Sequence, residues 1–241
     1  YPVYLFTTAV TGDTEGVEVE LLVNAQTSCL HDYTLTVDNM KAIEQADVIV
    51  MNGAGLEDFL SAALSASEAA VIDCSEAVEL RYIPEYEGPE GHGRKEYDPH
   101  YWMDPNRACQ AVETVAEALA ALDEDHAQDY RANAQAALES MDPDGLGSAA
   151  RYLCTLATGQ PSLSELVSHP GFITFHDGFP YFAQAFGLEL LKAIEEEEGA
   201  SASAAEIEEI VKLIDQHDLP AIFVEKNGSW ATAETIAGEV T

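Results

Sequence analysis

Short apolar runs rich in β-branched residues alternate with helical periodicity in this chain, and that rhythm constrains its fold most. In the first block, strands are predicted over residues 16–23, 47–51 and 69–73, and helices over 36–45 and 56–64. Such alternation is typical of α/β units built on a parallel sheet.

The same rhythm returns in the second half of the chain. Strands are predicted over 171–175, 188–194 and 220–225, and helices over 179–186, 203–217 and 230–239. Ser203 and Glu206 form a capping-box pattern at the start of one of these helices. Between the two blocks, only helices are predicted, over 106–122 and from Asp123 to about residue 141.

We therefore expect an α/β protein of two lobes, each with a parallel-type sheet flanked by helices, joined by one long rigid helix. The predicted boundaries are 1–122 for the N-terminal lobe, 123–148 for the linking helix and 149–241 for the C-terminal lobe.

Charge limits the classes of partner. The 241 residues include 10 basic and 44 acidic side chains, which gives a net charge of −34. This charge argues against nucleic acids and anionic membrane surfaces as partners, and it would attract cations only diffusely. The sequence contains no run of about 18 apolar residues, so no transmembrane helix is predicted. No signal-peptide pattern is present in this sequence.

One stretch is dense in residues with specific chemistry, and it lies where the first block gives way to the helical middle. It reads Asp98-Pro99-His100-Tyr101-Trp102-Met103-Asp104-Pro105. The two prolines predict a shaped loop, in which Tyr101 and Trp102 can exclude water. His100 offers an imidazole, the commonest metal ligand. Asp98 and Asp104 could orient that imidazole or cap the following helix.

Three histidines lie in loops or at a strand end: one in the loop after the first predicted strand, one in the loop that leads into the helical middle, and one at the carboxyl end of a strand in the second half. They are His31, His100 and His176, and each has an acid within two residues. In open α/β sheets, ligands bind beyond the carboxyl ends of strands, so these loops could converge on one ion. Three imidazoles suit the borderline softness of zinc. Convergence is a prediction about the fold, because the histidines lie far apart in sequence.

The remaining histidines and the cysteines are interpreted as structural or surface residues. His92 lies in a predicted loop over 84–97 and is interpreted as solvated, or alternatively as a weak auxiliary metal ligand, whereas His126, His169 and His217 lack the same company of loop and acid. The cysteines, Cys29, Cys74, Cys109 and Cys154, show no C-x-x-C spacing. Their three full pairings stay open, and Cys29 could alternatively be a thiolate ligand.

The motifs resemble those of the zinc and manganese substrate-binding proteins of ABC transporters. The matching segments are His31-Asp32-Tyr33, Asp47-Val48-Ile49-Val50-Met51-Asn52-Gly53 with Gly55-Leu56-Glu57, the His100 stretch, Phe172-Ile173-Thr174-Phe175-His176-Asp177-Gly178-Phe179 and Ala221-Ile222-Phe223-Val224-Glu225. The first two segments together match the N-terminal lobe as one motif, so four motifs in the family's order cover nearly the whole chain.

The resemblance implies an extracytoplasmic, periplasmic or lipid-anchored, monomeric protein that holds a metal between two lobes and passes it to a membrane permease. His31, His100 and His176 would be its ligands, and histidine at 176 favours Zn²⁺ over Mn²⁺. In this family, a loop beyond the position of Thr241 can carry an aspartate ligand. The fourth ligand is therefore left open between water, Glu225 and an acid outside these residues.

Other functions compete with zinc capture. A three-histidine zinc hydrolase or lyase would need an open metal position and a general base, such as Glu225 or Asp177. No H-E-x-x-H motif supports it. A manganese carrier and a cell-surface adhesion module that binds no metal are the further alternatives.

Overall fold

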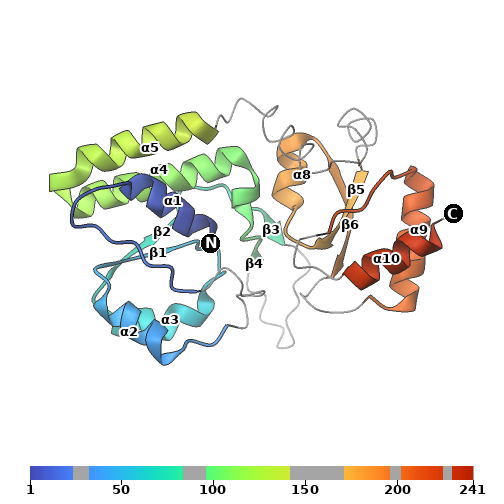
Figure 1. The fold of residues 1–241 in the computed structure, drawn as a ribbon, viewed down its shortest axis with the longest axis horizontal. Coiled ribbons are helices and arrows are strands. Elements are labelled where there is room, and N and C mark those ends of the chain that lie inside the picture. Colours follow the sequence, from blue (N-terminus) through green and yellow to red (C-terminus); the bar gives the residue numbers. More distant parts are fainter. Residues whose placement is uncertain (24–32, 84–95, 142–170, 196–201, 225–229, 241) are drawn as a thin grey trace. The chain divides into compact units, whose positions relative to one another are not determined.

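A computed structural model describes residues 1–23, 33–83, 96–141, 171–195, 202–224 and 230–240 of the chain. The chain divides into two compact units, Tyr1–Pro143 and Asp144–Thr241. Each unit contains its own two-stranded parallel sheet flanked by helices (Figure 1). The predicted α/β class, with parallel strands in both halves, is confirmed.

The sheet of the first unit pairs β1 (Val48–Met51) with β2 (Ala70–Asp73), in register from Val48 opposite Ala70 to Met51 opposite Asp73. Its helices are α1 (Pro2–Thr11), α2 (Val37–Gln45), α3 (Ser61–Ala66), α4 (Pro105–Leu122) and α5 (Ala127–Met141). Figure 1 shows α1 and α4 on one face of the two strands, and α2 and α3 on the other face.

Local sequence explains where these helices begin. Thr36 caps α2 by accepting from the backbone N–H of Asn39, whose side chain accepts from the N–H of Thr36 in return. The helix predicted over 106–122 is α4, and its apolar stripe of Ala108, Val112, Val115 and Leu119 is buried.

Helix α5 packs along α4 and α1 within the first unit. The amide of Asn133 fastens α5 to α1 by donating to the carbonyl of Val10 at 3.0 Å. The linking helix predicted over 123–148 stays a prediction, because residues 142–148 lie outside the described part of the chain.

A short antiparallel ribbon leads into the His100 stretch. It pairs β3 (Tyr82–Ile83) with β4 (Glu96–Tyr97), with Tyr82 opposite Tyr97. Directly after β4, the backbone N–H of Asp98 donates to the carbonyl of Arg81 at 3.0 Å. This hydrogen bond extends the ribbon by one step and fixes where the loop starts.

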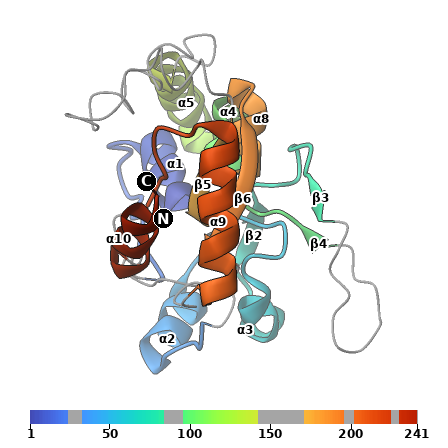
Figure 2. The same ribbon diagram turned by 90° about the vertical axis from the view of Figure 1, so that its right-hand side faces the viewer.

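The second unit is built on β5 (Gly171–His176) and β6 (Glu189–Glu195), which are parallel and connected through α8 (Pro180–Phe186). Helix α9 (Ala204–His217) begins at the predicted capping box of Ser203 and Glu206, and α10 (Trp230–Glu239) follows. Figures 1 and 2 show α9 lying over the two strands. The core joins the strands to both helices through Ile173, Phe175, Ile194, Ile210, Ile214, Leu219 and Ile236.

Two predicted strands need correction. The strand expected over 16–23 is absent, because its alternating pattern finds no neighbouring strand with which to pair among the described residues. Instead, Leu22 packs against the core of the first unit, and its carbonyl accepts from the amide of Asn39 at 2.7 Å. Of the strand expected over 220–225, Phe223 forms a single bridge to Thr174, and residue 225 is not among those described.

Both described cysteines, Cys74 and Cys109, are buried and carry free thiols. Burial raises the pKa of Cys74 to about 12, so this thiol acts as small apolar filler. Cys29 and Cys154 fall outside the described residues. None of the described helices combines the length and apolar character that a membrane span requires.

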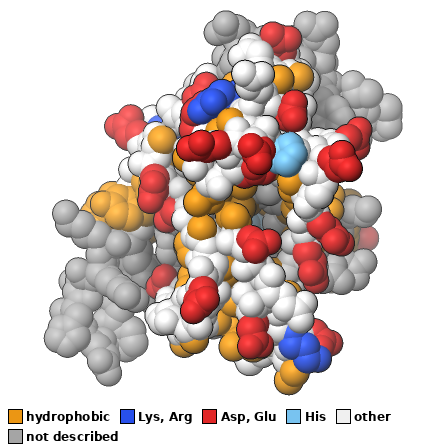
Figure 3. Space-filling model, turned by 90° about the vertical axis from the view of Figure 1, so that its left-hand side faces the viewer, with side chains coloured by type: hydrophobic (Ala, Val, Ile, Leu, Met, Phe, Trp, Pro, Cys, Tyr) orange, Lys and Arg blue, Asp and Glu red, His pale blue; other side chains and the backbone are white. Residues whose placement is uncertain are grey.

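Acidic side chains are dispersed over the face of the molecule drawn in Figure 3, with few basic side chains among them. Dispersed surface carboxylates fit the expectation of a diffuse negative field around the protein.

Candidate metal centre

The His100 loop is a compact turn between the β3–β4 ribbon and α4. A 3₁₀ turn covers Tyr101–Met103, and the backbone N–H of Met103 donates to the carbonyl of His100 at 3.1 Å. The His100 side chain is 15% exposed, so its ring is mostly enclosed while retaining access to solvent. The Trp102 ring lies edge-on to it, with centroids 5.2 Å apart.

Asp98 orients the imidazole. One carboxylate oxygen, Oδ1, lies 2.8 Å from Nδ1 of His100 and also accepts the backbone N–H of His100 at 3.0 Å. The Asp98 side chain is buried. This contact favours the tautomer with a proton on Nδ1. A metal bound by His100 would therefore bond to Nε2.

Asp104 has the other role that the sequence left open. Its Oδ1 accepts the backbone N–H of Asn106 at 2.9 Å, which caps α4 with Pro105 in the first turn. Its second oxygen pairs with Arg107. Asp98 thus orients the imidazole, and Asp104 caps the helix.

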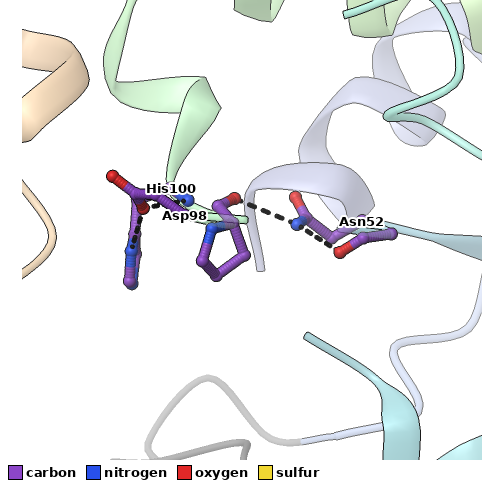
Figure 4. A network of polar contacts seen from close by, with 5 residues as sticks. Asn52, Asp98 and His100 are labelled. Atoms are coloured by element: carbon purple, nitrogen blue, oxygen red, sulfur yellow. Dashed lines mark hydrogen bonds and ion pairs between the residues drawn. The ribbon is translucent and has the colours of Figure 1, made fainter. Parts of the chain in front are cut away.

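Asn52, the first residue after β1, anchors the loop from the end of that strand (Figure 4). Its side-chain amide donates to the carbonyl of Pro99 at 3.1 Å, and its own carbonyl accepts the hydroxyl of Tyr101 at 2.8 Å. Asn52 and Tyr101 are fully buried or nearly so. Tyr101 therefore does more than exclude water, because its hydroxyl ties the loop to the strand end.

A half-buried carboxylate supports Asn52. Glu57 accepts the backbone N–H groups of Asn52 at 2.9 Å and Gly53 at 3.0 Å. Burial raises the pKa of Glu57 to about 7, against the lowering effect of these two backbone donors, and the nearby charge of Asp73 raises it further.

His176 is the last residue of β5 in the second unit, where its backbone pairs with Glu195. Its side chain is half-buried, and the neighbouring Asp177 is exposed. The hydroxyl of Thr174, itself fully buried, donates to the carbonyl of His176 at 3.0 Å. The predicted position at the carboxyl end of a parallel strand is confirmed for His176.

The structure describes two of the three predicted ligands, each in its own unit. His31 falls in the undescribed range 24–32, and Glu225 in 225–229. Within the described residues, no three His, Cys, Asp or Glu side chains gather to hold a metal. Shared coordination by His31, His100 and His176 stays a prediction.

Two other described histidines have structural positions. His126 Nδ1 lies 2.8 Å from Oδ2 of Asp123, just before α5. This contact raises the pKa of His126 and lowers that of Asp123. His217 is exposed at the last turn of α9. His92 and His169 lie outside the described residues.

Sequence reasoning missed the roles of Asn52 and Glu57. Asn52-Gly53 after a strand indicates a turn. This local signal does not predict the contact of Asn52 with Pro99, which lies 47 positions further along the chain.

Comparisons with known proteins extend this picture. The profile of the family described as "ZnuA: Zinc-uptake complex component A periplasmic" matches residues 1–241. The chain is 30% identical over 247 residues to the zinc-binding lipoprotein AdcA of Streptococcus pneumoniae, covering 99% of this chain but 46% of AdcA. It thus spans about half the length of that relative. It is 27% identical over 219 residues to the manganese-binding lipoprotein MntA of Halalkalibacterium halodurans, covering 87% of this chain and 67% of MntA.

Solved structures share the fold over nearly the whole chain. The Zn(II)-bound ZnuA-like domain of Streptococcus pneumoniae AdcA matches with a TM-score of 0.75 and 29% identity, covering 100% of this chain and 81% of that one. A crystal structure of ZnuA matches with a TM-score of 0.77 and 25% identity, covering 99% and 85%.

The two α/β units and the matches to these solved structures place the chain in the fold class of ZnuA-like binding proteins. Within that class, the match over residues 1–241 is decisive, and the chain belongs to the ZnuA family of zinc-uptake components.

Proposed function

We propose that this chain captures Zn²⁺ outside the cytoplasm and delivers it to the membrane permease of an ABC transporter. The proposed ligands are His31, His100 and His176, with water, Glu225 or an acid beyond these residues in the fourth position. The observation that carries the proposal is the contact of Asp98 with His100, at 2.8 Å, in a member of the ZnuA family.

The chemistry of this contact supports metal binding. A carboxylate that accepts the Nδ1 proton holds the ring in one orientation and makes Nε2 a more basic ligand. Neutral imidazole nitrogens bind zinc at about 2.0–2.1 Å, usually in tetrahedral sites. The Asp98–His100 pair is therefore prepared for one Zn–N bond.

Zinc is the favoured ion. Imidazoles suit zinc, whereas manganese prefers oxygen ligands. Two solved structures of one relative, Streptococcus pneumoniae AdcA, are Zn(II)-bound forms, each 29% identical to this chain. Manganese is the second candidate, and the 27% identity to a manganese-binding lipoprotein supports it. Competition between Zn²⁺ and Mn²⁺ for the purified chain would distinguish them.

The proposal is one of binding and delivery rather than catalysis. A carrier must enclose its ion without activating a water molecule, whereas a zinc hydrolase needs an open position and a base. We further propose that the protein works as a monomer, in the periplasm or attached to the outer face of the cytoplasmic membrane. Its relatives AdcA and MntA are named as lipoproteins.

Zinc affinity of single-site variants tests the proposal. His100→Ala and His176→Ala should each weaken Zn²⁺ binding at least about tenfold, because each removes one bond to the metal. Affinity is measured by calorimetric titration or by competition with a chelator of known affinity.

The matched control is His126→Ala. His126 also has Nδ1 2.8 Å from a carboxylate oxygen, that of Asp123, yet it has no proposed place at the metal. Its removal should leave zinc affinity unchanged. Unchanged affinity in both His100→Ala and His176→Ala would overturn the proposed function.

A further inference from the structure

Asn52 contacts the His100 loop on both sides of the proposed ligand. Its side-chain Nδ2 donates to the carbonyl of Pro99 at 3.1 Å, and its backbone carbonyl accepts the hydroxyl of Tyr101 at 2.8 Å. Pro99 and Tyr101 are the immediate neighbours of His100. One residue at the end of β1 therefore holds the backbone before the histidine and the side chain after it.

These two hydrogen bonds lie in the interior. Asn52 is 2% exposed and Tyr101 is 0% exposed. A buried polar group that loses its partner costs about 1–3 kcal/mol, so the loop cannot move away from Asn52 cheaply. Pro99 has no N–H group and cannot strengthen the loop by donating, which leaves its carbonyl as the point of attachment.

The position requires an asparagine-like donor. The Nδ2 group also lies 3.2 Å from the carbonyl of Gly53, so it is shared between two acceptors. An aspartate would place a negative oxygen against both carbonyls. A leucine of similar size would leave the Pro99 carbonyl without this donor.

Asn52 is itself held in place. Its backbone N–H donates to Glu57 at 2.9 Å, and its neighbour Met51 is the last residue of β1, in register with Asp73 of β2. The support of the His100 loop is thus the carboxyl end of the parallel sheet, which is a rigid element.

We propose that Asn52 is a positioning residue of the zinc site, which fixes His100 by holding Pro99 and Tyr101. This inference rests on the proposed function and names a residue that acts on the metal through His100 without touching it. Residues beyond the metal ligands commonly change metal affinity by about 10- to 100-fold when altered.

The test compares zinc affinity in Asn52→Leu, Asn52→Asp and Tyr101→Phe with that of the unaltered chain. We expect Asn52→Leu and Asn52→Asp to weaken Zn²⁺ binding about tenfold. Tyr101→Phe removes one hydroxyl from an otherwise unchanged ring, and we expect a loss of about threefold, since it breaks only one of the two hydrogen bonds. It keeps the test informative should either Asn52 variant fail to fold.

Asn133→Leu is the matched control. The Asn133 amide also donates to two backbone carbonyls, those of Val10 at 3.0 Å and Thr11 at 3.3 Å, but it joins α5 to α1. It should lower the thermal unfolding temperature and leave zinc affinity unchanged. Equal losses of affinity in Asn133→Leu and Asn52→Leu would mean that Asn52 acts only through general stability, which overturns the inference.

A double variant separates this inference from the proposed function. In a His100→Ala background, Asn52→Leu should weaken zinc binding no further, because its effect passes through the missing imidazole. A full additional loss would overturn the positioning role. If His100→Ala lowers affinity and Asn52→Leu and Tyr101→Phe do not, the inference alone is wrong. If His100→Ala itself has no effect, both the proposed function and the inference are wrong.

Discussion

A single oxygen of Asp98 accepts two hydrogen bonds from His100, one from the backbone N–H at 3.0 Å and one from ring Nδ1 at 2.8 Å. The backbone contact closes a turn over two residues, and the ring contact sets the orientation of the imidazole. Loop shape and ligand orientation therefore depend on the same buried carboxylate.

The substitution Asp98→Asn should separate these two effects. The amide oxygen of the new side chain could still accept both hydrogen bonds, but it carries no charge and polarises the imidazole less. We expect zinc affinity to fall about 10- to 100-fold, measured by chelator competition. The control is Asp123→Asn, which alters the equivalent contact with His126, and no loss relative to this control would contradict the role of Asp98.

Acidification should release bound zinc. Protons compete with the metal for imidazole nitrogen, so the apparent affinity falls as pH decreases, and each histidine ligand adds to the slope. Affinity measured from about pH 8 down to about pH 4 should decline more steeply in the unaltered chain than in His176→Ala. Zinc retained at the acidic end of this range would argue against a site built from histidines.

The sequence predicted the elements whose signals are local. The capping box at Ser203 and the helix predicted over 106–122 are both confirmed, because each depends on residues within a few turns of one helix. The strand expected over 16–23 failed, since an alternating pattern forms a strand only where another strand pairs with it.

Local sequence patterns do not predict the contacts that hold the His100 loop in place. Asp98 precedes His100 by two residues and Asp104 follows it by four, and only the three-dimensional turn shows that Asp98 meets the ring and Asp104 caps α4. Asn52 reaches Pro99 across 47 residues, a contact that depends on how β1 and the loop pack. The grouping of His31 with His100 and His176 depends on still longer separations and stays a prediction.

Glu57 should make stability depend on pH. Its pKa is raised to about 7, chiefly by burial, from an ordinary value of 4.5. The folded chain therefore holds a proton between these values that the unfolded chain has lost. The stability that Glu57 gains from holding this proton is fully present below about pH 4.5 and is lost as pH rises through about 7.

Comparing Glu57→Gln with the unaltered chain isolates this effect. Glutamine does not titrate, so the stability of the unaltered chain relative to Glu57→Gln should fall by on the order of 3 kcal/mol between about pH 5 and about pH 8. Urea unfolding at each pH measures it. Glu117→Gln is the control, because the hydrogen bond from Arg131 lowers the pKa of Glu117 and confines its titration to more acidic solutions. A pH-independent difference for Glu57→Gln would contradict the raised pKa.

Gly53 and Gly55 allow a test of how tightly the end of β1 is packed. Both have positive φ, +78° and +85°, so alanine at either is strained by about 1 kcal/mol. A Cβ atom at Gly53 would lie 1.8 Å from Oδ1 of Asp73, whereas a Cβ atom at Gly55 meets nothing within 4 Å. Asp73 cannot easily move, because the same oxygen accepts from the backbone N–H of Ser75 at 2.8 Å and its hydroxyl at 2.6 Å.

The two glycines should therefore respond differently to the same substitution. Gly53→Ala should lower the free energy of unfolding by about 2–5 kcal/mol, because strain and the clash with Asp73 add together. Gly55→Ala meets only the backbone strain and should lower it by about 1 kcal/mol. Denaturant unfolding of the two variants measures the difference, and equal losses would show that the strand end yields to the added methyl group.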